Sequence, residues 1–173
     1  MADVYVAAGS NVEPIRYLCR ALDALQAAFG PLTVSPAYRN RAVGFEGPAF
    51  VNLVVGFATD ESPAQVRSRL QQIESLCDRP RDAPKWAPRT MDLDILLYDS
   101  LVSDEPGLVL PRPDLVRRAY MLKPMADITP DLRHPTLQKT MRELWEASDA
   151  RGHALEVVTI PRCDPRRPPE SAP

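Results

Sequence analysis

Apolar residues along the first hundred positions follow two different periods in a fixed order, and this order constrains the fold. Spacings of three and four residues, typical of amphipathic helices, characterise 15–29 and 63–77. The short β-rich stretches are 3–8, 32–40, 50–59 and 92–98, and we expect the second of them to be interrupted or edged at Pro36. The order β-α-β-β-α-β predicts an α+β fold of the ferredoxin-like type, a sandwich with helices packed on an antiparallel sheet and a C-terminal extension.

Both expected helices carry boundary signals. Ser10 stands three residues before Glu13, as in a capping box, and Pro14 follows. Gly30 offers a stop for this first helix, and a Ser-Pro pair at 62–63 begins the second. We therefore expect two helices with defined ends.

The remaining third of the chain is rich in proline and less regular. Residues 100–135 predict one more short helix and strand, and 136–148 a weak helix. Five prolines fall within 161–173, which predicts a disordered tail. We expect a single domain over 1–160.

Composition and charge exclude several partners. The formal net charge is −2, so no positive field favours nucleic acid or an anionic membrane. No apolar run approaches the roughly 20 residues of a transmembrane helix, and no secretory leader follows Met1. The three cysteines are widely spaced, which favours a reducing compartment. We expect a cytoplasmic monomer that acts on small molecules.

Two aspartates interrupt the strand predicted at 92–98. Leu93, Ile95 and Leu97 alternate as a buried face should, whereas Asp92 and Asp94 share the opposite face. Two negative charges at such a short distance repel each other unless a cation lies between them. Mg²⁺ takes one or two carboxylates and leaves room for phosphate oxygens, so the pair predicts a magnesium site.

A basic segment precedes the acids. It contains Arg79, Arg81, Lys85 and Arg89, together with Trp86. Arginine matches phosphate oxygens, and an indole offers a flat surface to a planar ring, so the combination predicts a magnesium-nucleotide site. The alternative is that these charges pair with one another on a solvated face. The chain lacks a G-x-x-x-x-G-K-[ST] loop and the protein-kinase motifs, which excludes those two classes.

Several blocks of sequence together resemble one enzyme family. These are "AAGSN", "AVGFEGPAFVN", "LQQIE", "DRPRDAPKW", "KWAPRTMDLDIL" and "LPRPDLVRRAYMLKPMADITPDLRHP". In order and spacing they resemble the 6-hydroxymethyl-7,8-dihydropterin pyrophosphokinases of folate biosynthesis, over residues 4–135. The resemblance implies an ATP- and Mg²⁺-dependent transfer of the β,γ-pyrophosphoryl group to the pterin hydroxymethyl oxygen, with release of AMP.

The resemblance also implies roles on the nucleotide side. Asp92 and Asp94 would hold two Mg²⁺ ions that arrive with ATP, and Arg81 and Arg89 would join them as catalytic residues. The residues implied to bind the nucleotide are Gln71, Glu74, Arg79, Arg81, Lys85, Trp86, Arg89, Ile95, Arg112 and Arg118. For Gln71 and Glu74 the alternative is an ordinary polar helix face.

A second group of residues is implied to bind the pterin. Phe50 and Asn52 share one face of a strand, where an aromatic ring can stack on the pterin and an amide can pair with its edge. The full implied set is Asn40, Val43, Gly44, Phe50, Asn52, Trp86, Asp92 and Tyr120.

The chain departs from the family pattern at two cations. Arg112 stands where the family has histidine, and Lys85 where arginine is common. We expect an active enzyme with altered nucleotide affinity. A non-catalytic paralogue that binds pterin or nucleotide, and a ferredoxin-like binding module, are the alternatives.

Overall fold

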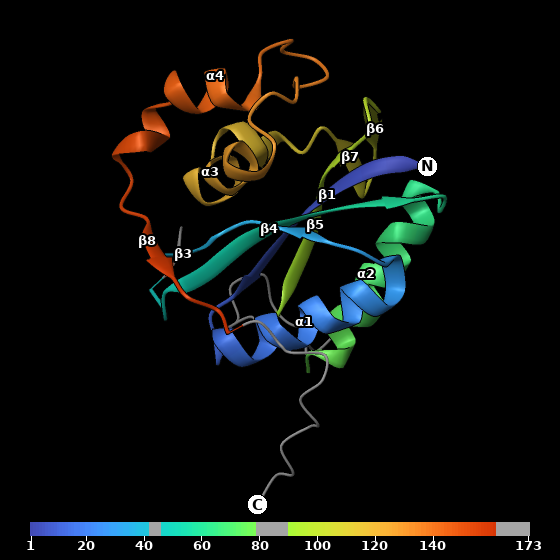
Figure 1. Ribbon diagram of the computed structural model, residues 1–173, viewed down its shortest axis with the longest axis vertical. Coiled ribbons are helices and arrows are strands. Elements are labelled where there is room, and N and C mark those ends of the chain that lie inside the picture. The colour runs from blue at the N-terminus through green and yellow to red at the C-terminus, as the bar shows by residue number, and fades with distance from the viewer. Residues whose placement is uncertain (42–45, 79–89, 162–173) are drawn as a thin grey trace, which may run out of the picture.

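The computed structural model describes residues 1–41, 46–78 and 90–161 (Figure 1). In chain order, with η for a 3₁₀ helix, the elements are β1 (Ala2–Ser10), α1 (Pro14–Phe29), β2 (Thr33–Val34), β3 (Ala37–Asn40), β4 (Phe50–Thr59), α2 (Pro63–Leu76), β5 (Asp92–Tyr98), β6 (Ser103–Glu105), β7 (Leu108–Leu110), η1 (Pro113–Val116), α3 (Ala119–Ile128), α4 (Met141–Glu146), η2 (Asp149–Gly152) and β8 (Glu156–Val158).

The main sheet is antiparallel and runs in the order β5-β1-β4-β3-β8, with β2 also paired to β4. The predicted antiparallel sheet with helices packed on it is confirmed. The stretch at 32–40, expected to be interrupted or edged at Pro36, is split there into β2 and β3, because Pro36 has no N–H to donate to a ladder. At the break, the Ser35 hydroxyl accepts a hydrogen bond from Val54 N at 2.8 Å.

Helices cover both faces of this sheet (Figure 1). Leu18 and Leu25 of α1 and Leu70 of α2 are buried against one face. Leu122 and Met125 of α3 belong to a separate buried cluster on the other face. This second helical layer contains α3, which lies within the stretch where a short helix is predicted, and α4, which lies within the predicted weak helix.

A bulge in β5 changes which side chains share a face. Tyr5 and Val6 of β1 are consecutive, but their partners, Leu97 and Ile95, are not, so Leu96 is the extra residue. Leu97 therefore packs in the α3 cluster, away from Ile95. The prediction that Leu97 continues the face of Ile95 was wrong.

The helix boundaries agree with the sequence at α2 but only in part at α1. Ser62 and Gln65 form a true capping box at the start of α2. At α1 the N-cap is Glu13 with φ 41° and no side-chain cap, so the capping box predicted from Ser10 was wrong. Gly30 ends α1 with φ 83°, as expected.

The C-terminal extension folds back on the sheet. A separate β6–β7 hairpin precedes η1 and α3. The weak helix predicted over 136–148 is limited to α4, and β8 pairs with β3. Residues 162–173, where the disordered tail was predicted, lie outside the described residues. Among the described helices, none combines the length and the hydropathy needed to span a membrane.

A buried histidine makes the loop between α3 and α4 sensitive to acid. His134 is 5% exposed, and its Nδ1 accepts backbone N–H groups of Thr136 at 3.4 Å and Leu137 at 3.3 Å. Burial lowers the pKa of His134 below 6.5. The unfolded chain therefore binds the proton more readily, and stability falls as the pH drops from about 6.5 toward the lower folded pKa.

We expect His134→Asn to remove most of this pH dependence of the free energy of unfolding between pH 7 and pH 5. Denaturant unfolding at several pH values measures it, and the exposed His153 provides the control substitution His153→Asn. Parallel pH profiles for the wild type and the His134 variant would contradict the prediction.

Candidate active site

The aspartate pair lies on the face of the sheet that α3 covers. Asp94 pairs in register with Ala7 of β1, and Asp92 with Gly9. Side chains of directly paired residues point to the same face, and Ala7 belongs to the α3 cluster. Leu93, between the two acids, points to the opposite face and is buried there. The structure therefore places both carboxylates side by side, as predicted.

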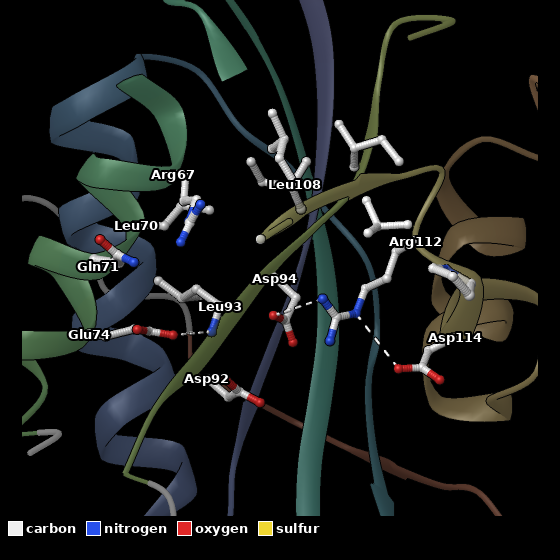
Figure 2. A pocket seen from close by; sticks show the side chains of 15 residues that line it. Arg67, Leu70, Gln71, Glu74, Asp92, Leu93, Asp94, Leu108, Arg112 and Asp114 are labelled. Atoms are coloured by element: carbon white, nitrogen blue, oxygen red, sulfur yellow. Dashed lines mark hydrogen bonds and ion pairs between the residues drawn. The ribbon is translucent and has the colours of Figure 1, made fainter. Parts of the chain in front are cut away.

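A cavity of about 480 Å³ opens beside the pair, at the edge of the sheet that β5 forms (Figure 2). Helix α2 forms one wall and the β6–β7 hairpin with η1 forms the other. Six residues predicted from the sequence line it: Gln71, Glu74, Asp92, Asp94, Ile95 and Arg112.

Glu74 connects α2 to the strand that carries the acids. Its Oε1 accepts the backbone N–H of Leu93 at 2.8 Å (Figure 2). This contact satisfies a donor on an edge strand and fixes the distance between the helix and β5. Gln71 lines the cavity from the preceding turn of α2. Gln71 and Glu74 therefore both face the cavity, unlike the residues of an ordinary polar helix face.

Arg112 lies across the cavity from α2 and contacts the acid pair. Its Nη1 is 3.2 Å from Asp94 Oδ1, and its Nε is 3.8 Å from Asp114 Oδ2. Arg118 Nε is 3.9 Å from the other oxygen of Asp114, but Arg118 does not line the cavity. Of the two predicted arginines here, the structure therefore brings only Arg112 into the site.

A row of residues crosses the sheet from Asp92 to the predicted pterin-binding amide. In register, Asp92 pairs with Gly9, Gly9 with Asn52, and Asn52 with Tyr38. Asn52 is 8% exposed, and its Nδ2 donates to Asn40 Oδ1 at 2.5 Å. The buried amide is therefore held by another amide, one strand away.

Gly9 leaves room for this amide. A Cβ atom at Gly9 would overlap Asn52 Oδ1 and lie 3.9 Å from Phe50 Cδ1. Both side chains therefore lie over the Gly9 backbone, which explains why β1 needs glycine at this position of "AAGSN".

We expect Gly9→Ala to weaken pterin binding by about tenfold, because the new methyl group displaces the Asn52 amide. Isothermal titration with the pterin and with a non-hydrolysable ATP analogue would separate this from an effect on the nucleotide. Gly152→Ala, with nothing within 4 Å of the added Cβ, is the matched control. Unchanged pterin affinity in Gly9→Ala would contradict the prediction.

Tyr120 lies on α3, near both aspartates. Burial raises its pKa, and the carboxylates of Asp114, Asp92 and Asp94 raise it further, while Arg118 lowers it. The phenol is therefore neutral and presents an aromatic ring on the same side of the sheet as the acids.

The other predicted site residues lie outside the described residues. They are Val43, Gly44, Arg79, Arg81, Lys85, Trp86 and Arg89.

Two features of the site were missed by the sequence analysis. Arg67 lines the cavity from α2, and its spacing of four from Gln71 was a usable signal. Tyr38 donates its hydroxyl hydrogen to Asp127 Oδ2, and Lys123 Nζ lies 2.5 Å from the other oxygen, Asp127 Oδ1. Nothing in the sequence pattern indicates the contact between Tyr38 and Asp127, which joins β3 to α3.

The donor chemistry of the acid pair fits magnesium. Within the described residues, no group of three or more His, Cys, Asp or Glu side chains could hold a metal ion. Mg²⁺, however, is commonly held by one or two carboxylates, with water and phosphate oxygens completing its shell. Asp92 and Asp94 on one strand face, beside a cavity, meet that requirement.

Comparison with known sequences gives consistent matches. The profile of the 7,8-dihydro-6-hydroxymethylpterin-pyrophosphokinase (HPPK) family matches residues 5–130. The chain is similar to the 2-amino-4-hydroxy-6-hydroxymethyldihydropteridine pyrophosphokinase of Pseudomonas aeruginosa, with 43% identity over 76% of this chain and 83% of the relative. The Aquifex aeolicus protein of the same name is 33% identical over 83% of this chain and 90% of the relative.

Solved structures give a likeness of fold. A Plasmodium falciparum protein named HPPK-DHPS superposes with a TM-score of 0.70 and 14% identity, over 84% of this chain. This chain spans 44% of that longer one. At this identity the likeness shows the fold alone.

Proposed function

This chain belongs to the 7,8-dihydro-6-hydroxymethylpterin-pyrophosphokinase family, and we infer from that membership that it transfers pyrophosphate from ATP to 6-hydroxymethyl-7,8-dihydropterin. It is a diphosphotransferase of folate biosynthesis, with ATP as co-substrate and AMP as the second product. The roles of its residues are proposed below.

One observation carries the assignment of roles. Asp92 and Asp94 lie between the cavity at the β5 edge and the row that leads through Gly9 to Asn52. Strands in a sheet are about 4.8 Å apart, so Asn52, two strands from Asp92, lies within about 10 Å of it. A nucleotide in the cavity and a pterin on the sheet face would therefore meet at the two acids.

We place the nucleotide in the cavity, against Gln71, Glu74, Ile95 and Arg112. Arg118 would act through Asp114 at the rim. Asp92 and Asp94 would hold two Mg²⁺ ions, which when bound would neutralise the charge on the phosphate oxygens. Outside the described residues, Arg79, Arg81, Lys85 and Arg89 supply further cations for the phosphates in this proposal.

We place the pterin against Asn52, with its ring near Phe50 and Tyr120. The Asn52 amide offers a donor and an acceptor to the pterin edge, and Asn40 orients that amide through the contact at 2.5 Å. Val43, Gly44 and Trp86 complete the pterin set in this proposal.

The reaction is an in-line displacement at the β-phosphorus. The pterin hydroxymethyl oxygen forms the new bond and gives up its proton to water, the bond between the β-phosphorus and the α,β-bridging oxygen breaks, and AMP leaves. Positioning and charge neutralisation carry most of the catalysis in such a transfer. Arg81 and Arg89 join the two aspartates as the proposed catalytic residues.

Four broader assignments complete the proposal. The order β5-β1-β4-β3 with α1 and α2 on one face supports the ferredoxin-like classification. The pairing of β8 with β3 supports one domain over 1–160. Free Cys19 and Cys77 are consistent with the proposed cytoplasmic location. A monomer remains our expectation.

The test is an assay of nucleotide products with purified protein, Mg²⁺, ATP and the reduced pterin. Pterin-dependent AMP without free phosphate is the expected result. ADP in place of AMP would contradict pyrophosphoryl transfer. Tight binding of either substrate without AMP would favour the non-catalytic paralogue, and binding of neither would favour the ferredoxin-like binding module.

A further inference from the structure

Arg112 lies next to the acid pair, where a bound metal cation would also lie. Its guanidinium lies between Asp94, 3.2 Å away, and Asp114, 3.8 Å away, at the wall of the cavity (Figure 2). The Arg112 and Asp94 side chains are 34% and 25% exposed, so the pair is partly shielded from solvent. Its attraction is therefore stronger than that of a fully exposed ion pair.

The backbone holds Arg112 in this place, while its side chain keeps an unused donor. The Arg112 N–H donates to Leu96 O at 2.9 Å, which anchors the residue to β5. Arg112 Nε is buried and has no hydrogen-bond partner within the described part of the chain. A buried donor without an acceptor costs free energy, so a new acceptor in the cavity would be favourable.

Phosphate oxygens are such acceptors, and a guanidinium binds them well. A divalent cation has the opposite relation to Arg112. To reach Asp94 it must approach the guanidinium closely, and the two positive charges repel each other.

We propose that Arg112 is a counter-ion of Asp94 in the nucleotide-free protein, and that it weakens divalent-cation binding at the acid pair until nucleotide phosphates engage the guanidinium. The inference rests on the proposed function of Asp92 and Asp94 as metal ligands. Metal and nucleotide then favour each other's binding, and by linkage the coupling is reciprocal. The effect is specific to a chain with arginine at this position.

The test is the affinity of the nucleotide-free protein for Mn²⁺, followed by electron paramagnetic resonance of the free ion. We expect Arg112→Gln to bind Mn²⁺ about tenfold more tightly than the wild type, from the removal of one positive charge several ångströms away. Arg112→Lys, which keeps the charge, should stay near the wild type. With a non-hydrolysable ATP analogue bound, the advantage of Arg112→Gln should disappear.

Two controls separate a local effect from net charge. Arg16→Gln removes a cation that pairs with Glu13 at 3.3 Å at the start of α1, and Arg142→Gln removes one that pairs with Asp131 at 3.0 Å. Both should change Mn²⁺ affinity by less than about threefold.

Equal gains in Arg112→Gln and Arg142→Gln would overturn the inference, as would equal affinity, or equally undetectable binding, in Arg112→Gln and the wild type. The AMP assay is independent of this measurement. A wild type that produces AMP, with no change in Mn²⁺ affinity in Arg112→Gln, would remove the counter-ion role and leave the proposed function intact. Absence of AMP would instead contradict the proposed function.

Discussion

Asp94→Asn should lower kcat by about a thousandfold or more while the protein stays folded. The substitution removes one negative charge from a pair whose proposed role is to hold the cations that neutralise the phosphate oxygens. Loss of a single group that stabilises developing charge typically costs hundredfold to thousandfold in rate. Steady-state AMP formation at saturating ATP and pterin measures the effect.

The fold should tolerate this change, because Asp94 is partly exposed at the wall of a cavity and the amide keeps its shape. Thermal unfolding of the variant checks this point. Asp23→Asn is the control for charge, since Asp23 is an exposed residue of α1, a helix packed on the opposite face of the sheet. A rate in Asp94→Asn within about tenfold of the wild type would contradict the two-carboxylate proposal.

Much of the fold follows from local patterns, but the bulge in β5 does not. In "LDILLY" both faces of the strand are apolar beyond Asp94, so a period of two cannot show where Leu96 is inserted. The insertion depends on pairing with Tyr5 and Val6, almost ninety positions earlier in the chain. Tertiary pairing therefore decides the register that the local pattern leaves open.

The start of α1 shows the same limit in another form. Ser10 and Glu13 have the spacing of a capping box, but β1 continues through Ser10, which pairs with Val51. The Ser10 hydroxyl then donates to Val12 O at 3.1 Å instead of capping the helix. At Ser62 no strand competes, and the capping box forms as predicted.

The candidate site divides along similar lines. The acid pair could be predicted, because both carboxylates belong to one strand and strand geometry fixes their relation. The contact between Arg112 and Asp94 could not be predicted, because the spacing of residues along the chain does not show which residues of separate elements meet. The wall that the β6–β7 hairpin gives to the cavity was missed for the same reason.

The second large effect is expected at Asn52. Asn52→Ala should weaken pterin binding by about fiftyfold, or about 2–3 kcal/mol, because the pterin edge loses a donor and an acceptor whose side chain is largely shielded from solvent. Isothermal titration with the pterin, in the presence of a non-hydrolysable ATP analogue, measures the loss. The affinity for the analogue itself should change by less than about threefold, since Asn52 does not line the nucleotide cavity.

Asn40→Ala is the matched comparison for Asn52. It removes the acceptor that orients the Asn52 amide but leaves the amide in place, so it should cost about tenfold, less than Asn52→Ala. An amide that only supports the fold would give a different pattern: both variants would lower the melting temperature and leave pterin affinity unchanged in the folded protein. The order of the two losses therefore tests whether the amide pair acts on the pterin or only on the sheet, because Asn40 contacts the Asn52 amide directly.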